Sequence, residues 1–280
     1  MREIDAKSVR TAVAELCVKA NVEISPDIAS AIKAARARET GDTAAWVLDA
    51  LIENAEIAAA ERMPICQDTG MAVVFVEIGQ DARVVGGSLA DAINGGVRDG
   101  YEAGFLRKSV VSDPIRRINT GDNTPAVIHY TVTSGDCLKI TVAPKGFGSE
   151  NMSAVKMLKP SDGLDGVKDF IMGCVTAARA NPCPPVIVGA GVGGTMEKAA
   201  LLSKTALLRP VGQPNPDPFW AEIEAEMLKK INATGIGPAG IGGNTTALAV
   251  NIEVYPTHIA GLPVAVNMGC HVTRHAEATL

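Results

Sequence analysis

Helix-like and strand-like segments follow one another in this chain without the regular βαβ repeat that a doubly wound sheet requires. Apolar residues recur at spacings of three and four over residues 5–37, with a break and N-cap at SPD (residues 25–27), and again over residues 42–61. The opening part of the chain is therefore expected to be helical. Further helices are expected over residues 88–106, 164–180, 196–208 and 218–234, and strands over residues 71–79, 186–190, 245–256 and 262–268.

The middle of the chain carries two β-rich runs on either side of the turn-forming sequence SGD. This pattern predicts a β-hairpin over residues 125–146, and the polar, glycine-bearing KGFGSEN of residues 145–151 is expected to be a loop. The chain is thus predicted to have an α+β fold. A helical N-terminal region is followed by mixed helices and strands with a central β-hairpin, in one domain over residues 1–280.

Composition excludes several classes of partner. Hydrophobic residues make up 47% of the 280 residues and the net charge is −5, so neither nucleic acid nor an anionic membrane is an expected partner. Basic residues focused in a cleft would still allow a small anionic substrate. The N-terminus has no apolar signal-peptide core, and no apolar run approaches the roughly 20 residues that span a bilayer. A cytoplasmic protein with reduced cysteines is expected.

Residues 181–202 contain the pattern G-x-G-x-x-G, formed by Gly189, Gly191 and Gly194 between an apolar run and a helix-like segment. A dinucleotide-binding turn also needs a second strand that ends in an acid about 20 residues further on, and no such strand is present. An NAD-dependent oxidoreductase is therefore a distant alternative, and a tight passage from strand to helix is the simpler interpretation. Cys183 lies six residues before Gly189 and is flanked by prolines, which raises the question of why a cysteine is rigidified there.

The segment CQDTG places a thiol, an amide, a carboxylate and a hydroxyl next to a turn-forming glycine. Cys66 is a candidate nucleophile without a nearby histidine base, or a candidate metal ligand with Asp68 placed beside it for proton transfer. None of the six cysteines forms a C-x-x-C pair, so spacing alone does not indicate a metal site.

Two further segments admit a structural and a functional interpretation. Three of the four histidines lie within residues 258–275, where structural histidines are the commoner case and Arg274 is interpreted as part of a solvated, near-terminal helix face. The glycine-rich residues 237–246 offer backbone N–H groups to an anion, or form a plain loop.

Seven motifs taken together resemble one family. CQDTG, LRKSVVSDP, NTGDNTPA, KGFGSEN, the proline-flanked Cys183 with VGAGVGGT, GPAGIGGNTTAL and NMGCH occur in the order found in class I fumarases. From about residue 10 onward the chain resembles the α subunit, or N-terminal half, of the iron–sulfur fumarate hydratase and L(+)-tartrate dehydratase group. The resemblance implies that residues 1–280 form one iron–sulfur hydro-lyase alpha-type domain. It also implies a [4Fe–4S] cluster held by Cys66, Cys183 and Cys270.

The same resemblance implies roles for individual residues. Asp68 is the candidate for proton transfer at the substrate hydroxyl, and Gln67 lies beside it on the substrate side. Arg107 resembles a carboxylate clamp, for which a guanidinium is well suited. Gly148 offers its backbone N–H to the substrate, and His258 is a hydrogen-bond partner in the pocket. Three ligands for four irons leave one iron open as a Lewis acid.

The function implied is the reversible hydration of fumarate to (S)-malate, a step of the tricarboxylic acid cycle, with a small dicarboxylate as substrate. Dehydration of L(+)-tartrate to oxaloacetate is the close alternative, and a non-catalytic partner-binding protein is a distant one. The family's remaining active-site groups belong to a β subunit, so a hetero-oligomer is expected. Phe147 and Asn244 depart from the family pattern, which expects a small residue and a lysine there. Cys17, Cys137 and Cys174 lie outside the motifs and are interpreted as small buried hydrophobes.

Overall fold

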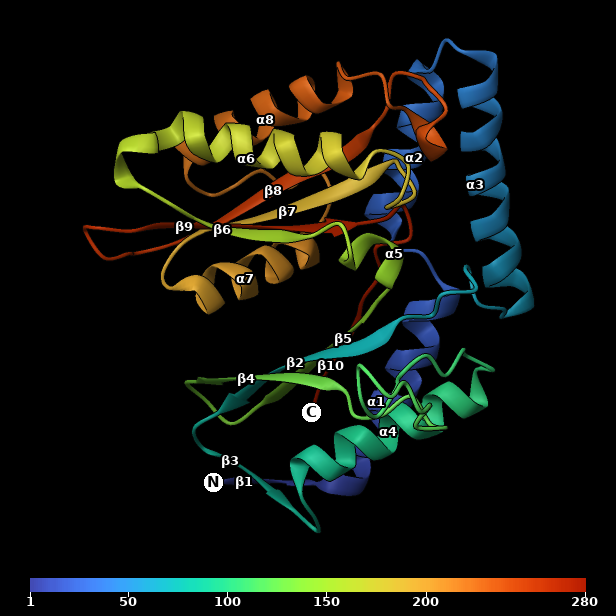
Figure 1. Ribbon diagram of the computed structural model, residues 1–280. Helices are drawn as coiled ribbons and strands as arrows, with labels where there is room; N and C mark the ends of the chain where they lie inside the picture. The colour runs from blue at the N-terminus through green and yellow to red at the C-terminus, as the bar shows by residue number, and fades with distance from the viewer. The chain divides into compact units, whose positions relative to one another are not determined.

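A computed structural model describes all 280 residues (Figure 1), and the chain divides into two compact units. Unit 1 consists of Met1–Ile24, Ala55–Phe147 and Arg274–Leu280, and unit 2 consists of Ser25–Asn54 and Gly148–Thr273. The chain therefore leaves unit 1 twice and returns to it twice. The family domain expected over residues 1–280 stays a prediction, because compact units and family domains are defined differently.

Unit 1 is built on a four-stranded sheet with the order β10-β5-β2-β4. β2 is parallel to β4 and antiparallel to β5, which is also antiparallel to β10. Helices α1 and α4 bury their apolar faces with these strands in one hydrophobic core. The elements of unit 1 are β1 (Arg2–Asp5), α1 (Ala6–Val22), β2 (Met71–Gly79), β3 (Ala82–Val85), α4 (Leu89–Ala103), β4 (Val127–Thr133), β5 (Leu138–Lys145) and β10 (Ala276–Thr279), with β1 and β3 forming a two-stranded parallel sheet.

The predicted central hairpin is wrong, although both of its strands exist. β4 and β5 are consecutive in the chain, but β2 lies between them in the sheet. The turn between them crosses the end of β2, where Gly79 donates to the Cys137 carbonyl at 2.8 Å. A Cβ on Gly79 would lie 2.3 Å from the Gly135 carbonyl oxygen, so a glycine is required at this crossing.

Unit 2 is built on a second four-stranded sheet with the order β6-β9-β7-β8. β9 is antiparallel to both β6 and β7, and β7 is parallel to β8. Figure 1 shows α6 and α8 on one face of this sheet and α7 on the other. Its elements are α2 (Pro26–Arg38), β6 (Ala154–Leu158), α6 (Gly163–Ala178), β7 (Val186–Gly193), α7 (Met196–Thr205), α8 (Pro218–Asn232), β8 (Ala247–Tyr255) and β9 (Leu262–Gly269), with short 3₁₀ turns η1 (Pro160–Asp162), η2 (Ala206–Leu208) and η3 (Pro238–Gly240).

The glycine pattern after Cys183 serves helix packing. Gly189 and Gly191 lie inside the fully buried strand β7, which continues to Gly193. Cβ atoms at these two positions would lie 2.2 Å from the Ser203 carbonyl oxygen and 2.1 Å from that of Ala199, both on α7. The glycines therefore let α7 lie against the backbone of β7, and the pattern does not form the phosphate-binding turn of a dinucleotide site.

The α+β class predicted from the sequence is confirmed, and most helices agree closely with the periodicity. α3 (Asp42–Glu61), which runs through the division between the units, has the bounds that the periodicity predicts. Residues 147–150, expected in a loop, form the short helix α5 (Phe147–Glu150). The near-terminal helix face proposed around Arg274 is wrong, because this segment is a turn that leads into β10. No helix is both long and apolar enough to cross a membrane, and the cytoplasmic location stays a prediction.

Candidate active site

The CQDTG turn lies in unit 1 between α3 and β2, with Cys66 half-buried, Gln67 exposed and Asp68 half-buried. The Asp68 carboxylate accepts a hydrogen bond from the Gly70 backbone N–H at 3.0 Å and from that of Phe147 at 2.9 Å. These two bonds use one oxygen each, so the orientation of the carboxylate is fixed while both oxygens keep a further acceptor site. Asp68 is therefore a carboxylate in a fixed orientation, with acceptor capacity left on both oxygens.

Arg274 holds the same turn from the other end of the chain. Its guanidinium Nη2 donates to the Asp68 backbone carbonyl at 2.5 Å, and the residue is only 5% exposed. A buried guanidinium without an acidic partner is costly, which indicates a specific role for its contact with the turn. The sequence places Arg274 on a solvated surface, and its burial is visible only in the tertiary structure.

Two more buried side chains complete the support of the turn. The Tyr101 hydroxyl donates to the Thr69 carbonyl at 2.8 Å and to the Gly70 carbonyl at 3.1 Å, and the Asn123 amide donates to the Gly70 carbonyl at 3.2 Å. Both side chains are fully buried. Three successive backbone carbonyls therefore receive side-chain donors from distant parts of unit 1, which rigidifies the turn.

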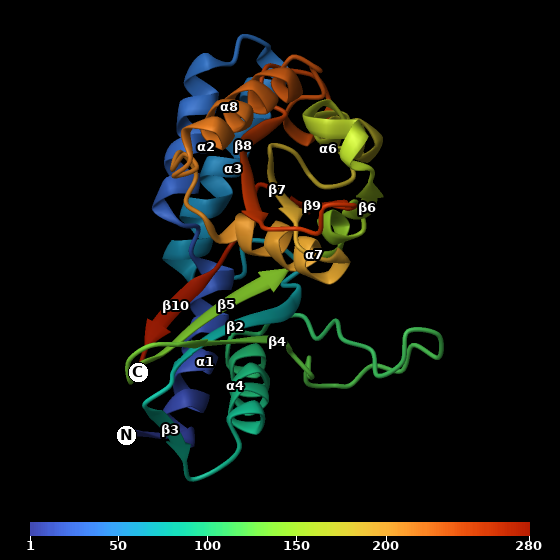
Figure 2. The ribbon, with the colours of Figure 1, turned by 90° about the vertical axis from the view of Figure 1, so that its left-hand side faces the viewer.

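Arg107 is exposed on the loop between α4 and β4, and this loop extends without helix or strand (Figure 2). The Thr69 hydroxyl accepts from the Arg107 backbone N–H at 2.9 Å and donates to the Arg107 carbonyl at 3.2 Å. The structure thus brings together the predicted proton-transfer residue Asp68 and the predicted carboxylate clamp through the residue next to Asp68.

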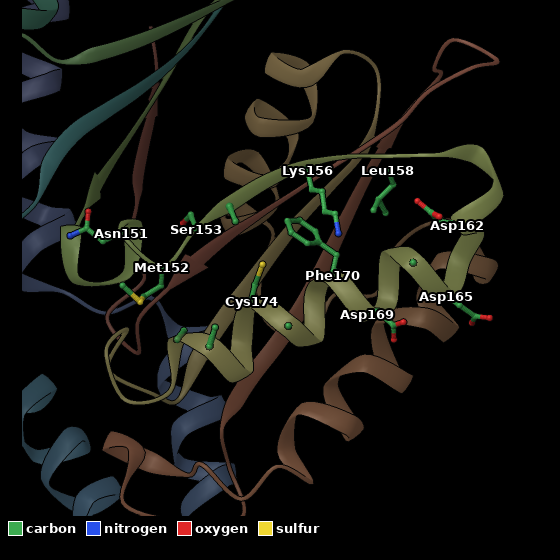
Figure 3. A pocket seen from close by; sticks show the side chains of 15 residues that line it. Asn151, Met152, Ser153, Lys156, Leu158, Asp162, Asp165, Asp169, Phe170 and Cys174 are labelled. Atoms are coloured by element: carbon green, nitrogen blue, oxygen red, sulfur yellow. The ribbon is translucent and has the colours of Figure 1, made fainter.

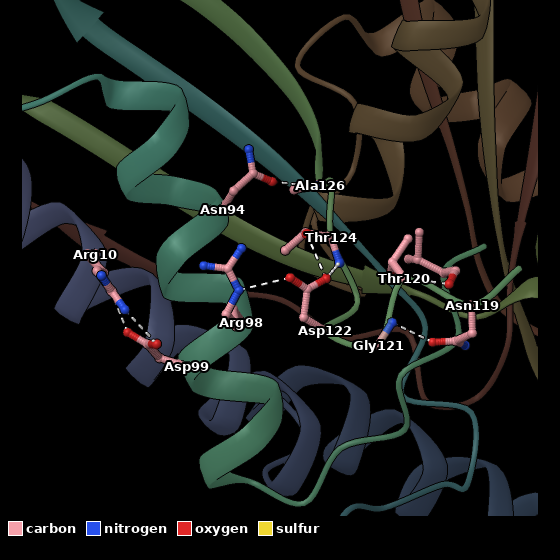
Figure 4. Close-up of polar contacts among 11 residues, drawn as sticks. Arg10, Asn94, Arg98, Asp99, Asn119, Thr120, Gly121, Asp122, Thr124 and Ala126 are labelled. Atoms are coloured by element: carbon pink, nitrogen blue, oxygen red, sulfur yellow. Dashed lines mark hydrogen bonds and ion pairs between the residues drawn. The ribbon is translucent and has the colours of Figure 1, made fainter. Parts of the chain in front are cut away.

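The far end of this loop is pinned to α4, as Figure 4 shows. Arg98 on α4 donates to the Asp122 carboxylate at 2.8 Å, and Thr124 donates to it through its hydroxyl at 2.7 Å. These hydrogen bonds lower the pKa of Asp122 to about 2. Asn123, between the two, turns inward and accepts from the Ser109 N–H at 2.7 Å.

Cys183 and Cys270 lie together in unit 2. β7 and β9 are antiparallel with Ile187 opposite Gly269, so Cys183, three residues before β7, and Cys270, directly after β9, lie at the same end of the sheet. His271 donates to the Cys183 carbonyl through both its backbone N–H (3.4 Å) and its ring Nδ1 (3.0 Å). Cys183 is exposed, with a left-handed φ of 55°, between buried prolines.

The glycine-rich residues 237–246 pack against the loop that carries Cys183. The Ala239 N–H donates to the Pro184 carbonyl at 2.8 Å, and a Cβ on Gly240 would lie 2.3 Å from the Ala180 Cβ. Asn244, which departs from the family pattern, donates to the Thr40 hydroxyl at 3.0 Å. This segment is therefore a packing element of unit 2.

The other two predicted residues lie differently. Gly148 is exposed in unit 2, and a Cβ on it would lie 3.6 Å from the carbonyl oxygen of Asn181, two residues before Cys183. His258 is exposed in the turn before β9, where its Nδ1 accepts from the Ala260 N–H at 3.2 Å. Because β9 separates His258 from Cys270 by roughly 25 Å at about 3.3 Å per residue, unit 2 does not bring these two together.

The surroundings of the thiols distinguish possible ligands from structural cysteines. Burial raises the pKa of Cys17 to about 12 and that of Cys174 to about 11, and a metal ligand has to be a thiolate. Cys137 is exposed in the turn between β4 and β5, so its assignment as a buried hydrophobe is wrong. Neither unit by itself holds three His, Cys, Asp or Glu side chains that could bind a metal ion. Of the three motif cysteines, Cys66 belongs to unit 1 and the other two belong to unit 2.

A cavity of about 810 Å³ lies between β6 and α6 in unit 2 (Figure 3), and none of the predicted site residues lines it. Its rim carries the carboxylates of Asp162, Asp165 and Asp169, with Lys156 as a basic lining residue. Three carboxylates disfavour an anionic substrate, so this cavity is a poor candidate for dicarboxylate binding.

Comparison with known proteins shows the class of protein: nearly the whole chain matches a family of hydro-lyases. Residues 10–279 match the family described as fumarate hydratase (Fumerase), and the chain belongs to that family. It is 40% identical, over 94% of both chains, to the putative L(+)-tartrate dehydratase subunit alpha of Methanocaldococcus jannaschii. It is 32% identical to the L(+)-tartrate dehydratase subunit alpha of Escherichia coli (strain UTI89 / UPEC), over 95% of this chain and 91% of the relative. The resemblance found in the motifs is confirmed, and membership of the family implies an iron–sulfur cluster.

Proposed function

We propose that this chain is the α subunit of a two-subunit [4Fe–4S] hydro-lyase that dehydrates L(+)-tartrate. The observation that carries the proposal is the nearly full-length similarity to two relatives, one named as an L(+)-tartrate dehydratase subunit alpha and one as a putative L(+)-tartrate dehydratase subunit alpha. Because both are named as subunits, a β subunit is the proposed partner and the active complex a hetero-oligomer. Hydration of fumarate to (S)-malate is the second candidate, supported by the description of the family.

The thiols of Cys66, Cys183 and Cys270 would hold the cluster. Their surroundings fit this role: none of the three is buried, and the loop that presents Cys183 is anchored by prolines on both sides. When bound, a cluster with one open iron supplies a Lewis acid for cleavage of the C–O bond.

The remaining chemistry belongs to the chain's own side chains and to the partner. Arg107 would bind a substrate carboxylate and Asp68 would transfer a proton at the substrate hydroxyl, which leaves as water. Gln67, Gly148 through its N–H, and His258 are the further proposed substrate contacts. The carbon-bound proton passes to a base that we place on the β subunit. The first product of tartrate is an enol, which tautomerises to oxaloacetate, and no redox cofactor is needed because the overall oxidation state is unchanged.

The test combines cluster content with substrate preference. The α chain is purified with its cognate β chain without oxygen, reconstituted with iron and sulfide, and assayed with L(+)-tartrate, (S)-malate and fumarate. About four irons per α chain and a tartrate rate well above the malate and fumarate rates are expected. The variant Cys183→Ser should lose the cluster, whereas the control Cys137→Ser, at an exposed cysteine outside the motifs, should retain it. A complex that stays colourless contradicts the proposal, and a preference for malate favours the second candidate.

A further inference from the structure

The Thr69 side chain links the CQDTG turn to Arg107 through two hydrogen bonds, and Thr69 is 1% exposed. Its hydroxyl makes both main-chain bonds that a paired strand would make with Arg107, accepting from the N–H and donating to the carbonyl. A single buried hydroxyl therefore holds both main-chain polar groups of Arg107 against the turn.

Thr69 is itself immobilised on the other side. Its carbonyl accepts from the fully buried Tyr101 hydroxyl on α4, so the turn cannot follow Arg107 if the loop shifts. The loop around Arg107 has no helix or strand of its own and contains one isolated bridge, between Val111 and Asn119. Without the Thr69 hydroxyl, the Arg107 backbone would be held only through its neighbours in the loop, by the Leu106 N–H on the Tyr101 carbonyl (2.9 Å) and the Ser109 N–H on the Asn123 side chain (2.7 Å).

We propose that Thr69 is a positioning residue that sets the separation between the Asp68 carboxylate and the Arg107 guanidinium. The inference rests on the proposed function, in which one of these groups meets the substrate hydroxyl and the other a substrate carboxylate. The hydroxyl and the carboxylate of one small substrate have to be contacted at the same time, and a misplacement of about 1 Å at such a site lowers the reaction rate strongly. Asp68 is adjacent to Thr69 in the chain and held by two backbone N–H groups, so removal of the hydroxyl displaces Arg107 rather than Asp68.

The experiment compares Thr69→Val, which keeps the shape and removes the hydroxyl, with Thr69→Ser, which keeps the hydroxyl. Both are measured in the reconstituted complex with the β subunit. Thr69→Val is expected to raise KM on the order of tenfold with a smaller change in kcat, because it weakens carboxylate binding. Thr69→Ser is expected to restore KM. The control Thr141→Val changes a similarly buried threonine on β5 and should leave both constants unchanged.

A double-mutant cycle separates positioning from general damage. In an Arg107→Ala background, Thr69→Val should cause no further rise in KM, because the group that it positions is already absent. Additive effects would overturn the inference. If Thr69→Val does not assemble with the β subunit, Thr69→Ala takes its place in the same cycle.

Hydrogen exchange gives a readout that does not depend on activity. The Arg107 amide should exchange faster in Thr69→Val than in wild type or Thr69→Ser, because it loses its acceptor. If Thr69→Val left both the exchange rate of the Arg107 amide and KM unchanged, the role of Thr69 would be refuted while the proposed function would stand. A wild-type complex that is inactive on tartrate, malate and fumarate would refute the proposed function, and with it the role of Thr69 in that reaction.

Discussion

Replacing Gly191 with alanine should force α7 away from β7 and destabilise unit 2. An ideal Cβ at this position would lie 2.1 Å from the Ala199 carbonyl oxygen, 2.6 Å from the Ser203 nitrogen and 2.8 Å from the Leu202 Cβ. The shortest of these is about 1.3 Å short of ordinary van der Waals contact. Two of the three atoms belong to the backbone of α7, so no side-chain rotation relieves the clash and the helix itself has to move.

The cost of this movement follows from overpacking. Extra atoms in a close-packed interior typically cost 1–3 kcal/mol, and a backbone clash belongs at the upper end of that range. We expect Gly191→Ala to lower the free energy of unfolding by about 3 kcal/mol. At about 2–4 °C per kcal/mol, Tm should fall by about 6–12 °C.

The assay is thermal and urea unfolding of the full chain, with Gly173→Ala as the matched control. Gly173 lies inside α6, and a Cβ there would meet nothing within 4 Å. Alanine is the better helix former by about 0.8–1.0 kcal/mol, so this variant should be slightly more stable than wild type. If Gly191→Ala unfolded at the wild-type Tm, the close packing of α7 on β7 would be the wrong explanation for the glycine pattern.

Three further outcomes are expected. The pKa of Asp122 is about 2 in the folded protein, below its ordinary value of about 3.9. The hydrogen bonds of its carboxylate therefore contribute their full stability above about pH 3.9, and this contribution is lost as the pH falls towards 2. Asp122→Asn should be less stable than wild type at pH 7, and in urea unfolding at pH 3 the difference in stability between the two should be smaller. Glu224→Gln should cost about 3 kcal/mol in urea unfolding because it removes the closer of the two carboxylates that face the buried Arg209 guanidinium and leaves only Glu253, at 3.6 Å; equal stability would argue against a buried pair. Iodoacetamide at pH 8 should label the exposed Cys137 and spare Cys17, whose pKa burial raises to about 12, as peptide mass spectrometry would show; labelling of Cys17 in the folded protein would contradict its burial.

Local patterns in the sequence predict the helices because helix formation depends on residues three and four apart. The bounds of α3 and α1 agree with the periodicity for this reason. Strand pairing depends on residues far apart, and the two strands around SGD are separated by β2, which is more than 40 residues earlier in the chain. A hairpin signal reports the turn and the strands but cannot report a third strand that inserts between them.

The candidate site shows the same division. The motifs predict Cys66, Asp68 and Arg107 as site residues, because the resemblance is carried by short ordered segments. The burial of Arg274 could not be predicted from the sequence, because a charged residue beside two histidines is typical of a solvated face. The carbonyl that accepts its hydrogen bond belongs to Asp68, which lies 206 positions away. The side chains that hold the turn are recognised only when the fold has placed them.

The return of the chain to unit 1 at Arg274 affects the order in which the protein can be made. Residues 274–280 supply β10, which pairs with β5, and they supply the guanidinium that holds the Asp68 carbonyl. During synthesis on the ribosome, these residues emerge only after the whole of unit 2. The CQDTG turn is translated long before Arg274, so the nascent chain carries Cys66 on a turn that lacks the Arg274 contact until residues 148–273 have been made.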